Sequence, residues 1–245
     1  AALNGYRNDH FAPYIFLSEN RGDAWKNIAT GLPLGAVNSV TEDPNSENIL
    51  YAGTDNGLYV TLDLGATWHA FSMNLPAVAV HDVVVQARDK HLLVGTHGRS
   101  IFKADIATLG SLANKMAAGK TPTLELFELE KQRVSPRWGM ARGFSDPYTP
   151  EISINFFAAQ AGVVSVSVQD ANGVEVNAME VTADAGFNSV SFHINFSKSG
   201  KIAFLKKNKT SLSPAADGNT YLPKGSYKVV LSAGKVKTSQ ELTLK

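Results

Sequence analysis

The chain has 245 residues, of which 44% are hydrophobic and 18% are charged, and its formal net charge is +1. This composition indicates one large or two modest globular domains, and it excludes an intrinsically disordered chain and a strongly basic nucleic-acid-binding protein. The absence of cysteine excludes disulfides, a thiolate nucleophile and a thiolate metal site, and no apolar run reaches the roughly 18 residues of a membrane-spanning helix.

The first part of the chain contains an internal repeat. The string SENRGDAWKNIATGLPLGAVN (18–38) aligns with TLDLGATWHAFSMNLPAVAVH (61–81) at a constant offset of 43, and ILYAGT matches LLVGT at an offset of 42. A period of about 43 residues, built from short β-branched stretches between Gly, Asn and Pro turns, is the length of one four-stranded propeller blade. Residues 1–105 are therefore predicted to be propeller blades.

Taken in chain order, the strands fill about two and a half blades. AALNGYR, YIFLSE and AWKNIA are expected as strands two to four of a first blade, with NDHFAP as an insertion. A complete blade follows at 37–43, 49–54, 57–62 and 67–71, and strands one to three of the next lie at 80–85, 91–96 and 100–105. Such a set cannot close. We expect the remainder of the propeller to come from a missing N-terminal part or a partner chain.

The turn TLDLGATW is predicted to be structural. Asp63 can accept backbone N–H bonds within the turn, Gly65 can adopt a positive φ, and Trp68 can face a neighbouring blade. The earlier copy has Asn20 where this one has Asp63, and a catalytic carboxylate could not be exchanged in that way. The structural set of both copies is Ser18, Asn20, Gly22, Trp25, Thr61, Asp63, Gly65 and Trp68.

The second part of the chain returns to strands after a break. Residues 106–123 are predicted to form a short helix and linker, since Leu109, Leu112 and Met116 recur at a spacing of three to four. Residues 124–245 contain seven alternating apolar segments separated by turns such as Asn172-Gly173, which predict a β-sandwich. The lysine-rich stretch 198–209 is expected to be a solvated loop, with a binding patch as the alternative.

The motif S/T-x-D-x-G-x-T-W is similar to the Asp box of bacterial-neuraminidase-type repeats. GYRNDHFAPY, EDPNSENILYAGTDNGLYV, LPAVAVHDVVV and THGRSIF resemble the closing blades of the large sortilin-like, "glycosyl hydrolase, repeat" proteins of bacteria, over most of residues 5–105. GFNSVSFHI and LPKGSYKVVLSAGKVKTSQELTL resemble the immunoglobulin-like domain of flagellar-hook-capping proteins. The resemblance implies an all-β exported protein, either periplasmic, outer-membrane-associated or extracellular, in which the Asp box is structural.

A non-catalytic recognition or scaffold role, binding a protein, peptide or glycan, is the favoured function. The alternative is the C-terminal part of a sialidase-like glycoside hydrolase whose acid and nucleophile lie in N-terminal blades outside this chain. Whether the protein is an enzyme stays open at this point, and we expect no cofactor, metal or nucleic acid. The candidate ligand-binding residues, placed near a central channel, are Arg7, Asp9, His10, His81, Asp82, His97 and Arg99.

Overall fold

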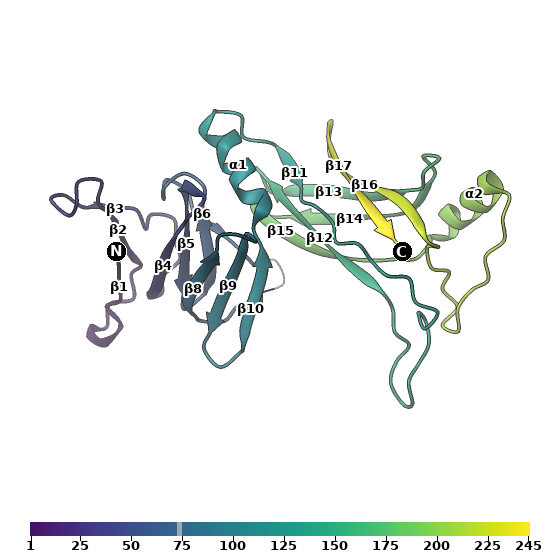
Figure 1. The fold of residues 1–245 in the computed structure, drawn as a ribbon, viewed down its shortest axis with the longest axis horizontal. Coiled ribbons are helices and arrows are strands. Elements are labelled where there is room, and N and C mark those ends of the chain that lie inside the picture. The colour runs from purple at the N-terminus through teal and green to yellow at the C-terminus, as the bar shows by residue number, and fades with distance from the viewer. Residues whose placement is uncertain (73–74) are drawn as a thin grey trace. The chain divides into compact units, whose positions relative to one another are not determined.

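The computed structural model describes residues 1–72 and 75–245, which divide into two compact units, Ala1–Pro122 and Thr123–Lys245 (Figure 1). Within this described part, the strands of all five sheets pair antiparallel and no sheet closes on itself. Helices are confined to α1 (Ala107–Ala117), α2 (Lys198–Asn208) and the 3-10 turn η1 (Tyr6–Asn8). The prediction of an all-β chain is confirmed.

The first unit contains three sheets in chain order. The first has the order β1-β2-β3, with β1 (Ala2–Leu3), β2 (Tyr14–Leu17) and β3 (Lys26–Asn27). The second has the order β4-β5-β6-β7, with β4 (Val37–Asp43), β5 (Ser46–Thr54), β6 (Gly57–Thr61) and β7 (His69–Ala70). The third has the order β10-β9-β8, with β8 (Val80–Gln86), β9 (His91–Thr96) and β10 (Ile101–Asp105).

A regular seam of hydrogen bonds joins the second sheet to the third. Two side chains on β4 and one in the β4–β5 turn each donate to the backbone carbonyl 42 residues further along: Asn38 to Val80 at 3.2 Å, Thr41 to Val83 at 2.7 Å, and Asn45 to Ala87 at 3.4 Å. Gly53 on β5 allows the close approach of β8, because a Cβ there would lie 2.8 Å from a methyl of Val80. The 42-residue spacing of the sequence repeat is thus also the spacing of these contacts.

Helix α1 follows the third sheet within the same unit. Leu109 and Leu112 are buried, as the spacing of apolar residues predicts, and the backbone N–H of Ile106 donates to the carbonyl of Lys90 at 2.9 Å. The helix therefore packs through its apolar stripe, and the short hydrogen bond fixes its start to the β8–β9 turn.

The second unit consists of two sheets around one core. One has the order β11-β12-β15, with β11 (Leu124–Leu126), β12 (Glu151–Ala158) and β15 (Gly186–His193). The other has the order β14-β13-β16-β17, with β13 (Gly162–Gln169), β14 (Glu175–Ala183), β16 (Gly225–Ala233) and β17 (Val236–Leu244). Alternation along the strands buries one face of each sheet, and the two faces share the core of Ile152, Ile154, Phe156, Val164, Val166, Val168, Val229 and Leu231.

The lysine-rich stretch is a helix, so the expectation of a loop at 198–209 is wrong. The Oγ of Ser197 accepts from the N–H of Gly200 at 3.0 Å and caps α2. Phe204 is buried against Phe196, with ring centroids 5.0 Å apart. The Ser197 cap, the buried Phe204 and side-chain hydrogen bonds from Lys201 to Thr220 and from Asn208 to Asp170 hold a helix whose other side chains are mostly polar.

Candidate functional site

The turn between β6 and β7 is closed by its own side chains. One carboxylate oxygen of Asp63 accepts from the N–H of Thr67 at 2.8 Å and from the hydroxyl of Thr61 at 2.7 Å, and the other accepts from the hydroxyl of Thr67 at 2.7 Å. The Thr61 oxygen in turn accepts from the N–H of Gly65, whose φ is +85°. The carboxylate of Asp63 is therefore committed to holding the turn.

Protonation in this turn is set by opposing effects. Partial burial raises the pKa of Asp63, but the hydrogen bonds from Thr67 and Thr61 and the charge of His69 outweigh it and hold that pKa below its ordinary value. Burial lowers the pKa of His69, against the opposing charge of Asp63. Asp63 is thus an anion near neutral pH and has no proton to give to a leaving group.

The same turn is fastened to the preceding sheet. The indole N–H of Trp68 donates to the carbonyl of Ile28 at 2.6 Å, and a Cβ on Gly65 would lie 2.7 Å from the Cβ of Ile28. Trp68 is 9% exposed, whereas its repeat equivalent Trp25 is 54% exposed. The first turn keeps its internal bonds, since Ser18 and Asn20 accept from the N–H groups of Gly22 and Ala24, but no earlier sheet is present for its tryptophan.

His81 and His97 lie together at the start of β8 and just after β9. Their ring centroids are 5.0 Å apart and the rings are tilted by 33°. Asp82 accepts from the N–H of Val83 at 2.9 Å, and Arg99 stands exposed in the β9–β10 turn. Of the four predicted residues on this sheet, the structure brings the two histidines into contact.

The candidates near the N-terminus form a separate group. Arg7 lies in η1, Asp9 ends that turn with a φ of +56°, and His10 packs over Gly5. Among the described residues, no hydrogen bond or ring contact joins Arg7, Asp9 or His10 to the histidine pair. That all seven residues bind a ligand stays a prediction.

A polar chain that the sequence analysis did not single out lies beside the histidine pair. Asn4 donates to the side-chain oxygen of Asn38 at 3.0 Å, and the Asn38 amide donates to Asp55 at 2.9 Å as well as to the carbonyl of Val80. Asn38 is the repeat equivalent of His81, so the alignment already contained the signal. The amide of Asn38 is thus satisfied within the protein and holds Asn4 and Asp55 beside the two imidazoles, which are the polar groups available to a ligand.

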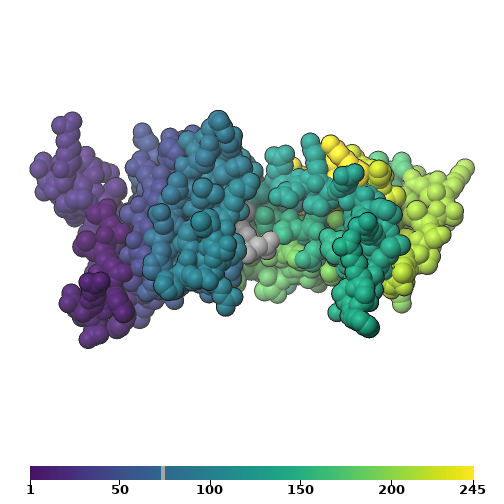
Figure 2. Space-filling view, turned by 60° about the horizontal axis from the view of Figure 1, so that its bottom comes forward, coloured from purple at the N-terminus to yellow at the C-terminus, as the bar shows by residue number. Residues whose placement is uncertain are grey.

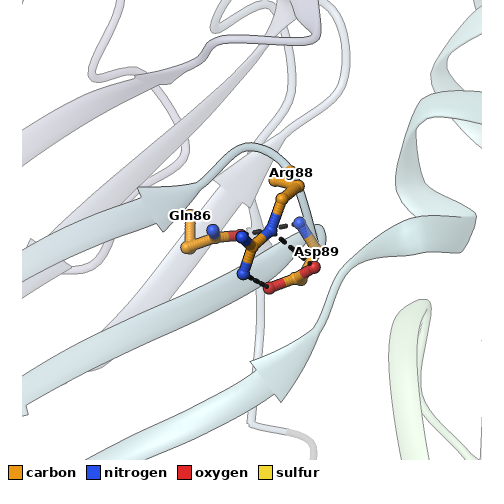
Figure 3. Close-up of polar contacts among 3 residues, drawn as sticks. All are labelled: Gln86, Arg88 and Asp89. Atoms are coloured by element: carbon orange, nitrogen blue, oxygen red, sulfur yellow. Dashed lines mark hydrogen bonds and ion pairs between the residues drawn. The ribbon is translucent and has the colours of Figure 1, made fainter.

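The β8–β9 turn carries an exposed ion pair (Figure 3). The guanidinium of Arg88 donates to both carboxylate oxygens of Asp89, at 3.1 and 2.8 Å, and Gln86 accepts from the N–H of Asp89 at 2.6 Å. The hydrogen bond from Arg88 lowers the pKa of Asp89. Because both side chains face solvent, the pair contributes little to stability and shapes the turn only.

Neither a metal-binding cluster nor a membrane-spanning helix is found in the part of the chain that the structure describes. Across residues 1–72 and 75–245, no three His, Asp or Glu side chains gather closely enough to hold a metal ion. Of the helices that the structure describes, none combines the length and apolarity needed to cross a bilayer.

Comparison with known proteins gives only distant likenesses. No family model and no curated protein matches the chain. Two structures of the extracellular domain of the one-component or hybrid two-component system BT4673 from B. thetaiotaomicron are similar at 11% and 10% identity, with TM-scores of 0.31 and 0.30. They cover 96% and 100% of this chain, which spans 29% and 31% of theirs. A beta-glucosidase from Listeria innocua is similar at 13% identity, with a TM-score of 0.25, over 49% of this chain and 15% of that chain.

Proposed function

We propose that residues 1–105 are the closing blades of a β-propeller, that 106–123 link them onward, and that 124–245 form an immunoglobulin-like β-sandwich. Together they are the non-catalytic recognition and scaffold portion of an exported bacterial protein that binds a protein, peptide or glycan. Export is implied by the resemblance to Asp-box repeat proteins. The remainder of the propeller is the expected partner of the first unit.

The observation that carries this proposal is the hydrogen bond from Trp68 to the Ile28 carbonyl. It makes the Asp-box turn a fastener between successive sheets, and the same role for Trp25 requires a further sheet on its exposed side. The seam between β4 and β8 supports the same arrangement, because its donors and acceptors recur at one spacing. A polypeptide built of such sheets buries their faces only by stacking more of them.

The polar groups at the strand starts supply the recognition surface. His81, His97 and the Asn38 amide lie at the same end of neighbouring strands, where a propeller presents its binding loops. The nearby carboxylates are engaged, since Asp55 accepts from Asn38 and Asp82 accepts from a backbone N–H. The two exposed imidazoles can therefore hydrogen-bond to a polar ligand, with Asn38 and Asp55 holding the surface in place.

Quenching of Trp25 tests the proposal. Trp68 and Trp138 are 9% and 7% exposed, so acrylamide quenching of the 245-residue chain reports mainly Trp25. The Trp25 component is the difference in quenching between the wild type and Trp25→Phe. In a longer gene product that includes the flanking propeller segments, this component should fall severalfold. An equal Trp25 component in the short and long chains would contradict the proposal.

A further inference from the structure

The loop between β11 and β12 contains a hairpin, residues 137–148, with a fixed base. The N–H of Gly139 donates to the carbonyl of Tyr148 at 2.8 Å, and the N–H of Tyr148 donates to the carbonyl of Met140 at 3.1 Å. Trp138 is buried in the core of the second unit, with its ring edge-on to Tyr221 at 5.7 Å. Figure 1 shows this loop extending beyond the strands of its own unit. The base therefore holds the hairpin in a defined place.

The tip of the hairpin is a closed turn that presents apolar side chains to solvent. The N–H of Ser145 donates to the carbonyl of Arg142 at 3.1 Å, and Gly143 has a φ of +59°. Phe144 is fully exposed, at 112%, and Tyr148 and Met140 are 61% and 50% exposed. Large apolar groups held outward on an ordered turn are typical of an interaction site.

The hairpin and the segment that leads into it have an excess of positive charge. Residues 131–148 contain Lys131, Arg133, Arg137 and Arg142 against one acidic residue, Asp146, in a chain whose net charge is only +1. A further carboxylate, that of Asp217, lies against Gly139 at the base of the hairpin rather than at its tip. An occupant of this surface must therefore combine negative charge with a region that accepts an aromatic ring.

The form of the hairpin favours a lipid surface over a folded protein. A specific protein interface buries about 800 Å² on each partner, which a four-residue turn cannot supply. A bilayer interface requires no complementary shape, accepts aromatic rings at the head-group level and attracts basic residues when its lipids are anionic. The same segment protrudes from its surroundings in the space-filling view (Figure 2).

We propose that the hairpin at residues 137–148 is a peripheral docking site for an anionic lipid surface. Phe144 enters the head-group region, and Arg137 and Arg142 pair with lipid phosphates. This docking is independent of the propeller proposal, because it uses residues of the second unit alone.

A fluorescent label at the tip tests the proposal in the full 245-residue chain. Because the chain has no cysteine, Ala141→Cys can carry an environment-sensitive dye, with Ile202→Cys on α2 as the matched control. The probe is a vesicle of phosphatidylcholine and phosphatidylglycerol in equal parts. We expect a blue shift at position 141 and none at position 202, and none at either position with pure phosphatidylcholine.

Substitutions at the hairpin tip and on α2 test which residues bind the vesicle. In vesicle sedimentation, Phe144→Ser and Arg142→Gln should each lower the partition coefficient about fivefold, while Ile202→Ser leaves it unchanged. Circular dichroism checks that each variant folds. The proposal is overturned by the absence of a shift on anionic vesicles, or by a Phe144→Ser variant that binds like the wild type. It is equally overturned by an equal shift with soluble poly-L-glutamate, which would indicate an acidic protein ligand, or by loss of binding only in Lys206→Gln/Lys207→Gln.

Discussion

At the scale of single residues, the two equivalent tryptophans of the repeat differ in burial and in hydrogen bonding. Trp68 has both burial and a hydrogen-bond acceptor on the preceding sheet, whereas Trp25 is half exposed. Both turns keep the hydrogen bonds from backbone N–H groups to the Ser or Thr oxygen and to the Asn or Asp oxygen, so the difference in tryptophan burial arises from what lies next to each turn. Comparing substitutions of the two tryptophans therefore isolates what the contact between sheets contributes to the free energy of unfolding.

Trp68→Phe should lower the free energy of unfolding by about 1 to 3 kcal/mol, because it removes the indole donor and leaves the buried Ile28 carbonyl unpaired. The matched variant Trp25→Phe should change it by less than about 0.5 kcal/mol. Urea titration followed by far-UV circular dichroism measures both, without reliance on tryptophan fluorescence. Equal losses in the two variants would show that the Trp68 contact adds nothing to stability.

His69 gives the first unit a dependence on mildly acidic pH. Burial holds the pKa of His69 in the folded protein below its ordinary value of 6.5, so the unfolded chain binds the proton more tightly. The free energy of unfolding therefore falls as pH decreases through 6.5 toward the lower folded-state pKa. The depressed pKa of Asp63 acts in a separate window, since its stabilisation is present above 3.8 and is lost only below.

His69→Gln should flatten this dependence. Between about pH 7 and about pH 5, the wild type should lose stability by up to about 1.4 kcal/mol per pH unit more than the variant. Urea midpoints at several pH values measure the difference. If the two proteins show the same slope, the histidine is not the group responsible.

At the scale of elements, two helical glycines have opposite surroundings. A Cβ on Gly200 of α2 would lie 2.1 Å from the carbonyl oxygen of Val176, whereas a Cβ on Gly110 of α1 would meet nothing within 4 Å. Helix propensity alone favours alanine at both positions by about 1 kcal/mol. At Gly200, the packing of α2 against β14 determines whether alanine stabilises or destabilises the protein.

We expect Gly110→Ala to stabilise the protein by about 0.5 to 1 kcal/mol and Gly200→Ala to destabilise it by about 1 to 3 kcal/mol. Thermal unfolding followed by circular dichroism gives both values from the same instrument. A stabilising Gly200→Ala would mean that α2 does not lie against the Val176 backbone.

Most of the strand positions can be predicted from the sequence, whereas helix α2 cannot. The strands of the first unit follow from the repeat, and β4 begins and ends where it was predicted. Helix α2 was missed because Ile202, Phe204 and Leu205 do not repeat on one face, and Ile202 is 69% exposed. The Ser197 cap, the burial of Phe204 and the hydrogen bond from Asn208 to Asp170 contribute to its stability, and none of these contacts can be inferred from a count of lysines.

The candidate site, too, could be predicted only in part from the sequence. Asn38 aligned with His81, yet an asparagine carries no chemical signal until its partners are known. Conversely, His81 and His97 lie with their ring centroids 5.0 Å apart, a contact that their separation along the sequence does not reveal. Spacing along the chain predicted which residues lie at strand starts, and only the three-dimensional arrangement separates those that meet from those that do not.

At the scale of the whole molecule, the partners of the carboxylates near the candidate site support the proposal of a non-catalytic role. A glycosidase needs two carboxyl groups about 5 or 6.5 to 9.5 Å apart, one of which gives up a proton. Asp63 is held as an anion by its turn, Asp55 accepts from Asn38, and Asp82 accepts from the N–H of Val83. In the described part of the first unit, each of these acids already has a structural partner.

The purified 245-residue chain should therefore release no nitrophenol from a panel of aryl glycosides above the buffer rate, at any pH between about 4 and about 8. Asp55→Asn and Asp82→Asn test the acids beside His81, because activity that rests on either carboxylate must fall in the corresponding variant. Turnover that copurifies with the chain and falls in either variant would make the first unit catalytic. It would also place the reacting carboxylates at the strand starts beside His81, where the recognition surface is proposed, rather than in the β6–β7 turn.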